Sequence, residues 1–220
     1  MEAVRTAAAI LLLAIATVPS AVCAEQGTLS HHDAQLIAQT GFEREVLEII
    51  REETRGPLHR LSGYDEDGYQ ILVNGIAAAV PHGKAGQVLT ALRGRLAARR
   101  YMAFIVEESP TIRMDRIAVL RGTDQYEILR VMYTHAEDGD LVPQDLIDTL
   151  KGWEKRYQFE IIGAENDWVE IEFKDLPKDL GTFVDEVVEL CPDAVDGSPG
   201  DVTELIKELY TTRRLLLWWE

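Results

Sequence analysis

The chain has 220 residues and a formal net charge of −16, with 22 Lys and Arg against 38 Asp and Glu. The acidic excess is uneven: residues 25–120 carry 11 basic and 13 acidic side chains, whereas residues 121–220 carry 10 and 24. A field this negative repels phosphate groups, so we expect neither nucleic acid nor an anionic membrane as a partner. A basic protein partner or a cation is compatible with the charge, and so is a surface charge that only keeps the protein in solution.

Residues 1–24 have the organisation of a signal peptide. Arg5 precedes a mostly apolar run over residues 7–18, which is too short to span a membrane as a helix. Small residues around Cys23 predict cleavage after Ala24 and export, with a periplasmic or extracellular location. Lipid attachment at Cys23, after cleavage in front of it, is the alternative. The mature chain contains no other long apolar run, so we expect it to have no membrane span.

After the leader we expect a mobile lead-in over residues 25–40 and then a small α/β half over residues 41–112. The predicted elements of this half are an amphipathic helix over 41–53, a strand-rich segment over 69–80, a helix over 87–98 and a buried strand from Tyr101. Within the strand-rich segment, Asn74-Gly75 is a candidate hairpin turn. The stretch GYDEDG in front of it is typical of a turn.

Residues 113–220 are expected to form a second α+β unit. Its predicted elements are a strand from Arg116, a short helix over 125–133, a helix from Pro143, hairpin strands over 159–163 and 168–173, a helix from Pro177, a helix over 202–210 and a final strand in LLLWW. Without the helices over 125–133 and 202–210, the order is β-α-β-β-α-β. This order predicts a ferredoxin-like sheet, in which the last strand lies beside the first hairpin strand. The chain as a whole is therefore predicted to be an α+β protein.

The final strand has apolar residues on both of its faces. Along a strand, Leu215, Leu217 and Trp219 point one way, whereas Leu216 and Trp218 point the other way. We therefore expect both faces to be covered, one by helices and the other by the first half of the chain or by a partner subunit.

Several motifs in the second half occur together and in order. They are LKGWEKRYQFEIIGAENDWVEIEFKDLP, ELCPDAVDGSPG and the terminal LWWE, with GKAGQVLTALRGRLAARRYMAFIVEE upstream. In these motifs the chain resembles the bacterial family known as domain of unknown function 4253. It departs from the family pattern at Glu220, where the family usually has Asp, and in the loop after Cys-Pro-Asp. The resemblance implies a shared fold and carries no mechanism.

Cys191 is the one cysteine that the mature chain keeps, and it is a candidate reactive thiol with His135 as a candidate base. Two features argue against that role. Cys191 continues the apolar stripe of its helix after Val187, and it lies at the helix C-terminus, where the helix dipole disfavours a thiolate. We therefore interpret Cys191 as a buried structural residue and predict no catalytic residue.

One face of the second hairpin strand is acidic. Glu170 and Glu172 share this face with Trp168, and Glu160 is expected opposite them on the neighbouring strand. These charges require solvent, a cation, a basic surface, or docking against basic residues of the first half. Those basic residues are Arg93, Arg95, Arg99 and Arg100. Our predicted binding residues are Trp168, Glu170, Glu172, Asp193, Trp218 and Glu220.

Three further motifs are weak. The run Asp65–Gly68 lacks the later ligands of a calcium loop, and His31-His32 has no nearby partner in the sequence. Gly83-Lys84 lies in front of a helix, where phosphate can bind, but the rest of a phosphate-binding loop is absent. We therefore predict no metal site and no cofactor.

These observations favour an exported, non-catalytic module that binds a basic protein through an acidic surface. One alternative is a hydrolase or transferase that uses Cys191 or the carboxylates Asp167, Asp193 and Glu220. Another is a cation-binding module.

Overall fold

The structure, a computed structural model, describes residues 30–109, 111–136, 141–196 and 202–219. The predicted signal peptide and Glu220 lie outside these residues. The strands are β1 (Leu58–Tyr64), β2 (Gln70–Pro81), β3 (Tyr101–Ser109), β4 (Met114–Arg121), β5 (Phe159–Ala164), β6 (Trp168–Phe173) and β7 (Arg214–Trp218). The helices are α1 (His31–Thr40), α2 (Arg44–Thr54), α3 (Ala85–Leu96), α4 (Glu127–Met132), α5 (Pro143–Glu154), α6 (Leu180–Leu190), α7 (Asp193–Asp196) and α8 (Val202–Thr212), with a 3-10 turn η1 (Ala97–Arg99). The predicted α+β class is confirmed.

All seven strands belong to one sheet in the order β1-β2-β4-β3-β5-β6-β7. The predicted ferredoxin-like order is wrong, because β7 pairs with β6, the second hairpin strand, and β4 lies between β2 and β3. A short connection folds β4 back onto β3 as an antiparallel hairpin, so β4 joins the first half of the sheet. The predicted boundary between residues 112 and 113 falls inside this hairpin. A parallel contact between β3 and β5 joins the two halves.

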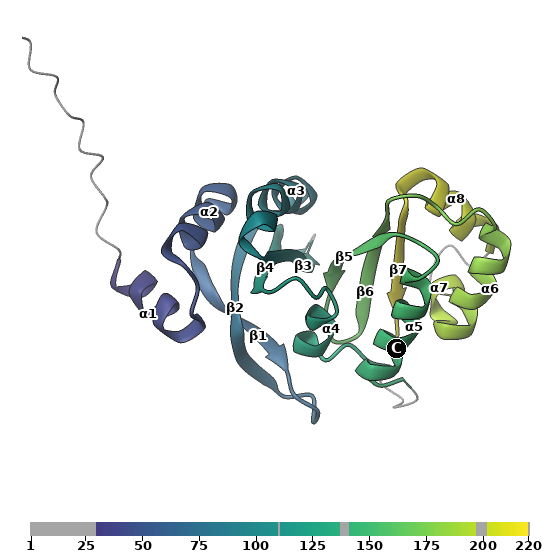
Figure 1. The fold of residues 1–220 in the computed structure, drawn as a ribbon, viewed down its shortest axis with the longest axis horizontal. Helices are drawn as coiled ribbons and strands as arrows, with labels where there is room; N and C mark the ends of the chain where they lie inside the picture. The colour runs from purple at the N-terminus through teal and green to yellow at the C-terminus, as the bar shows by residue number, and fades with distance from the viewer. Residues whose placement is uncertain (1–29, 110, 137–140, 197–201, 220) are drawn as a thin grey trace, which may run out of the picture.

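Helices cover opposite faces of the two halves (Figure 1). Apolar residues of α2 and α3 pack on one face of β2, β4 and β3 and form what we call the N-terminal core. Apolar residues of α4, α5, α6 and α8 pack on the other face, mainly over β5, β6 and β7, and form the C-terminal core. The central strands serve both cores: on β3, Ile105 belongs to the N-terminal core, whereas its neighbours Phe104 and Val106 belong to the C-terminal core.

The first hairpin differs from the prediction. Asn74-Gly75 is not a turn, because β2 runs through it: residues 70–72 and 76–78 pair with β1 on either side of a register shift, and residues 75–81 pair with β4. The turn is at GYDEDG, where Asp65 Oδ1 accepts hydrogen bonds from the amides of Asp67 and Tyr69. Gly75 serves close packing, since a Cβ there would lie 2.8 Å from a methyl carbon of Leu61. A glycine inside a strand can mark such a close approach as readily as a turn.

The expected mobile lead-in is also incorrect for its described part, because residues 31–40 form helix α1. Ser30 caps this helix, and Arg51 Nη1 donates a 2.7 Å hydrogen bond to the buried Asp33 carboxylate. His32 bonds to the carbonyl oxygen of Leu58 at 2.8 Å. These polar contacts join α1 to α2 and β1.

The final strand is covered fully on one face only. Leu215 and Leu217 are buried in the C-terminal core, whereas Leu216 is 47% exposed and Trp218 is partly exposed. The expectation of two covered faces is therefore wrong. The reason is that α1, α2 and α3 pack over the N-terminal half and none of them covers β7. None of the described helices is long and apolar enough to cross a membrane.

Candidate functional site

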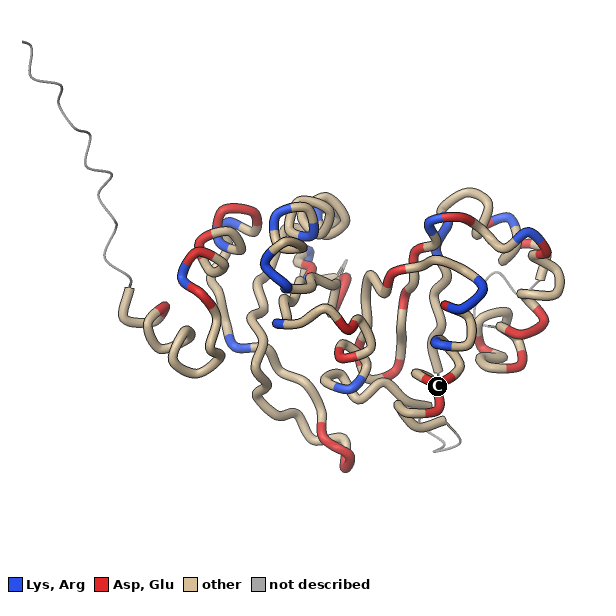
Figure 2. The backbone as a smooth tube through the Cα atoms, viewed as in Figure 1, with Lys and Arg blue, Asp and Glu red and all other residues tan. Residues whose placement is uncertain are grey.

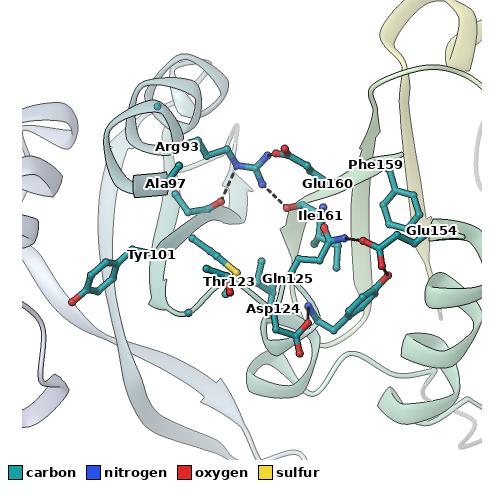
Figure 3. A pocket seen from close by; sticks show the side chains of 16 residues that line it. Arg93, Ala97, Tyr101, Thr123, Asp124, Gln125, Glu154, Phe159, Glu160 and Ile161 are labelled. Atoms are coloured by element: carbon teal, nitrogen blue, oxygen red, sulfur yellow. Dashed lines mark hydrogen bonds and ion pairs between the residues drawn. The ribbon is translucent and has the colours of Figure 1, made fainter. Parts of the chain in front are cut away.

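The open face of the C-terminal half begins at the edge of α3, where Arg93 reaches across to β5 (Figure 3). Arg93 Nε donates to the carbonyl oxygen of Ala103 at 3.1 Å, and Nη1 donates to Glu160 Oε2 at 2.7 Å. Nη2 donates to the carbonyl oxygen of Ile161. One side chain thus ties α3, β3 and β5 together, as expected for internal docking of the basic cluster.

The predicted acidic pair is present and is neutralised internally. Glu160 lies directly opposite Glu172 in the β5–β6 ladder. Arg93 binds Glu160 from one side, and Arg214 Nε donates to Glu172 Oε1 at 3.0 Å from the other. Because both carboxylates already have arginine partners, this part of the face does not require an external cation.

Further along the same face lies a groove of about 370 Å³. Its lining residues are Ile105, Glu107, Glu108, Trp168, Glu170, Leu216 and Trp218, and we call it the tryptophan groove. Three strands contribute to it: β3 through its C-terminal end, β6 and β7. Two indoles, two aliphatic side chains and three carboxylates therefore meet in one concave surface.

The position of Trp168 depends on a glycine in the neighbouring strand. A Cβ on Gly163 would lie 2.7 and 2.8 Å from two ring carbons of Trp168, closer than real contacts allow. The Trp168 ring therefore lies over the bare backbone of β5 and packs against the edge of the N-terminal core. The missing side chain at Gly163 lets the ring form part of the wall of the groove.

Glu170 is the unusual charge in the groove. Its side chain is 23% exposed, and its closest cation is Arg214, whose Nη1 lies 3.9 Å from Glu170 Oε1. No described residue donates a hydrogen bond to it. The pKa of Glu170 is raised to about 7: burial is the main cause, Arg214 opposes it, and the negative charges of Glu108, Glu172 and Glu208 add to it.

The other two carboxylates of the groove differ from each other. Glu107 Oε2 lies 2.9 Å from Arg116 Nε, so its charge is balanced inside the protein. Glu108 is exposed and has no cationic partner among the described residues. Glu108 and Glu170 are therefore the carboxylates that an external cation would meet.

The structure brings together only part of the predicted binding set. Trp168, Glu170 and Trp218 line the groove, and Glu172 lies beside it on β6. Asp193 begins α7 and does not line the groove. Sequence analysis missed four lining residues, namely Ile105, Glu107, Glu108 and Leu216. The only sequence signal for the glutamates is a charged pair that directly follows an apolar strand.

Cys191 is buried, as predicted, and is 0% exposed. Its thiol donates to the carbonyl oxygen of Trp218 at 3.1 Å, and burial raises its pKa to about 11. The candidate base His135 bonds instead to the carbonyl oxygen of Tyr133 through Nδ1. The two groups therefore do not form a nucleophile–base pair, which would need a hydrogen bond between them and an activated thiol.

A larger pocket of about 670 Å³ lies at the junction of the two halves, with Arg93 and Glu160 in its lining (Figure 3). Its polar side chains bind each other: Glu154 accepts hydrogen bonds from Gln125 Nε2 and from the Tyr126 hydroxyl, each at 2.9 Å. The amide of Ile161 donates to Gln125 Oε1 at 2.8 Å. This network joins α4, α5 and β5, and its members are already partnered without a ligand.

The Gly83-Lys84 turn is likewise occupied from inside. The buried Asp115 carboxylate accepts a 2.9 Å hydrogen bond from the Gly83 amide, which is the kind of donor that a phosphate would need, and lies 2.7 Å from His82 Nδ1. Within the described part of the chain, no three His, Cys, Asp or Glu residues are grouped to hold a metal ion. The tryptophan groove is therefore the best candidate site.

Residues 116–220 match the model of a family described as Domain of unknown function (DUF4253). No curated protein and no solved structure matches the chain. The matched region includes the β6 and β7 walls of the groove, whereas Ile105, Glu107 and Glu108 precede it.

Proposed function

Because residues 116–220 of this chain belong to the DUF4253 family, whose description names no activity, we propose a function from the geometry of the tryptophan groove. The protein is a non-catalytic module that binds a basic segment of a partner protein. A Lys or Arg side chain of that segment enters the groove between Trp168 and Trp218. Glu170 and Glu108 neutralise its charge.

The observation that carries this proposal is the state of Glu170. A mostly buried carboxylate without a hydrogen bond destabilises the folded protein once it is ionised. Such a group is typical of functional sites, where a ligand supplies the missing partner. A cationic side chain in the groove would meet Glu170 at short range in a poorly hydrated environment, where the attraction between charges is strongest.

The apolar walls favour an organic cation over a metal ion. The indoles of Trp168 and Trp218 line the groove, and indole rings attract ammonium and guanidinium groups. Ile105 and Leu216 offer apolar surface for the methylene stem of such a side chain. A metal ion would need several oxygen ligands with defined geometry, and Glu107 is already engaged with Arg116.

The charge of the whole C-terminal half supports a protein partner. Residues 121–220 carry 24 acidic and 10 basic side chains, and such a surplus accelerates the encounter with a basic protein. The composition of residues 1–24 supports export, so the proposed partner belongs to the cell envelope or the extracellular space.

A binding experiment with matched charge variants tests the proposal. The probe is a synthetic lysine-rich peptide, followed by the change in indole fluorescence at about pH 8, where Glu170 is ionised. We expect Glu170→Gln to weaken binding about tenfold, the effect of losing one partly buried charge partner. Glu66→Gln, at the tip of the β1–β2 turn, makes the same change in net charge far from the groove and should leave affinity within about twofold. Equal losses in the two variants, or no binding even at low salt, would rule out the groove as the recognition site.

A further inference from the structure

The edge of β7 adds a second kind of contact beside the groove. We infer that the basic segment binds as an extra β-strand along β7, so that its backbone and its basic side chain are recognised together. This inference rests on the proposed function and specifies the conformation of the partner. It follows from which backbone groups of β7 are already bonded.

The ladder between β6 and β7 uses alternate residues of β7. The amide of Trp219 donates to the carbonyl oxygen of Asp167 at 2.9 Å, and the amide of Phe173 donates to the carbonyl oxygen of Arg213 at 2.8 Å. The pairing between these points is regular antiparallel, without a bulge. Odd-numbered residues of β7 therefore point their backbone groups toward β6, and even-numbered residues point theirs away from the sheet.

At both ends of this outer edge, backbone groups already form hydrogen bonds within the protein. At one end, the amide of Arg214 donates to Thr212 Oγ1 at 3.0 Å. At the other end, the thiol of Cys191 donates to the carbonyl oxygen of Trp218. Between them, no described residue bonds to the amide or carbonyl of Leu216, or to the amide of Trp218. Three adjacent backbone groups thus have no hydrogen-bond partner among the described residues, on a strand that α7 and α8 also contact and whose central residue, Leu216, is 47% exposed.

The free edge and the groove are adjacent. The side chains of Leu216 and Trp218 line the groove, while their backbones form the edge. A strand added to β7 therefore places alternate side chains on the groove face, next to Leu216 and toward Glu170. Backbone pairing would provide register, and the groove would select a basic residue at one position.

An open strand edge could pair with a second copy of this chain or with a segment of another protein, and the charge of the groove distinguishes the two. A second copy of this chain would bring two acidic C-terminal halves together, each with Glu108 and Glu170 near the contact. Like charges on adjoining strands oppose pairing. A basic extended segment instead has charge complementary to the groove, so it is the occupant we propose.

The test uses two forms of a short peptide in which lysine and valine alternate. One form is N-methylated on the lysines and the other on the valines, so each loses the backbone N–H groups along one edge only. Strand addition predicts that one form binds about tenfold more weakly than the unmethylated peptide, while the other stays within about twofold. Similar affinities for the two forms would overturn the inference, because recognition by side chains alone does not distinguish the edges.

A pair of variants tests the same edge from the protein side. Leu216→Pro removes an outward-pointing amide and leaves the ladder with β6 intact, whereas Leu216→Ala keeps that amide. We expect the proline variant to lose about tenfold in affinity and the alanine variant about twofold. If the proline variant does not fold, the comparison of the two methylated peptides still tests strand addition.

The outcomes separate this inference from the proposed function. Binding that depends on Glu170 but treats both methylated forms alike would refute strand addition and keep the groove as the binding site. Binding that ignores Glu170→Gln would refute the proposed function itself. A dimer in sedimentation that Leu216→Pro abolishes would show that a second copy occupies the edge and would overturn the inference.

Discussion

The two halves of the sheet bury opposite faces and also treat their charges differently (Figure 2). In the N-terminal half, arginines of α3 and of the following turn η1 bind the carboxylates of α2: Arg95 contacts Glu52 and Glu53, and Arg99 contacts Glu45. At the junction with the C-terminal half, by contrast, the carboxylates of Glu108 on β3 and Glu170 on β6 have no hydrogen bond from a described residue. Ion pairs also occur in the C-terminal half, as between Arg156 and Glu186, so the difference between the halves is confined to the carboxylates of the groove.

This difference follows from how the sheet is covered. Where α2 and α3 lie side by side on one face, their charged rims meet and neutralise each other. Over β5 to β7 none of the described helices lies on that face, because those that cover these strands are on the other side. The tryptophan groove therefore forms where the cover of the first half ends, and its exposed groups have no layer above them.

The largest effect is expected at the junction of the halves. Arg93→Met keeps much of the side-chain volume but removes the donor to the carbonyl oxygens of Ala103 and Ile161 and leaves Glu160 unpaired beside Glu172. We expect the free energy of unfolding, measured by chemical denaturation, to fall by about 2–3 kcal/mol. Arg95→Met, two residues along the same helix, breaks exposed ion pairs and should cost about 0–1 kcal/mol. Equal costs for the two variants would mean that the halves are not joined through Arg93.

A smaller loss is expected when the wall of the groove is displaced. In Gly163→Ala the new methyl group collides with the Trp168 ring, so the ring must move, and we expect a loss of about 1–3 kcal/mol in unfolding free energy. Binding of the lysine-rich peptide should fall with it. Gly152→Ala is the control: no atom lies near its added methyl group inside α5, so it should be neutral or stabilise by up to about 1 kcal/mol. Unchanged stability and binding in Gly163→Ala would contradict the described position of Trp168.

The smallest effect is a gain in stability that depends on pH. Burial raises the pKa of Glu170 from 4.5 to about 7, so the folded protein holds this proton more tightly than the unfolded chain does. The stabilising contribution is full below pH 4.5 and is lost as the pH rises through about 7. Glu170→Gln has no such proton to lose. We therefore expect the difference in unfolding free energy between this variant and the native protein to be about 1–2 kcal/mol more favourable to the variant at about pH 8 than at about pH 4.

Glu172→Gln is the control for that gain, because Glu172 accepts a 3.0 Å hydrogen bond from Arg214, whereas Glu170 lies 3.9 Å from the same guanidinium and accepts none. This variant should not become more stable as the pH rises. A similar pH-dependent gain in both variants would show that general repulsion in the acidic half, and not the burial of Glu170, is responsible.

Several features of the site could be predicted because they depend on neighbours along the chain. The alternation of Trp168, Glu170 and Glu172 placed all three on one strand face, and the short AEND connection placed Glu160 opposite Glu172. The apolar stripe that leads to Cys191 correctly indicated a buried thiol. Each of these conclusions needs only a helix or strand period and a tight turn.

The order of the strands could not be predicted in the same way. Local periodicity is the same whether β7 pairs with β5 or with β6, so the ferredoxin-like arrangement was as consistent with the pattern as the observed one. The glycine of Asn74-Gly75 also has two readings, a turn or a close packing contact, and only the positions of Leu61 and Leu120 distinguish them.

The sequence by itself therefore determined most of the helices and strands, the buried thiol and the acidic strand face, because hydrophobic periodicity and turn chemistry act over a few residues. Only the tertiary structure decided that the two halves are covered on opposite faces and that Glu107 and Glu108 of β3 join Trp168 and Trp218 across β5. It also decided that Glu170 is mostly buried, with its closest cation, Arg214, 3.9 Å away. These properties depend on contacts between residues far apart in the chain, and burial, which sets the charge state of Glu170, exists only once those contacts have formed.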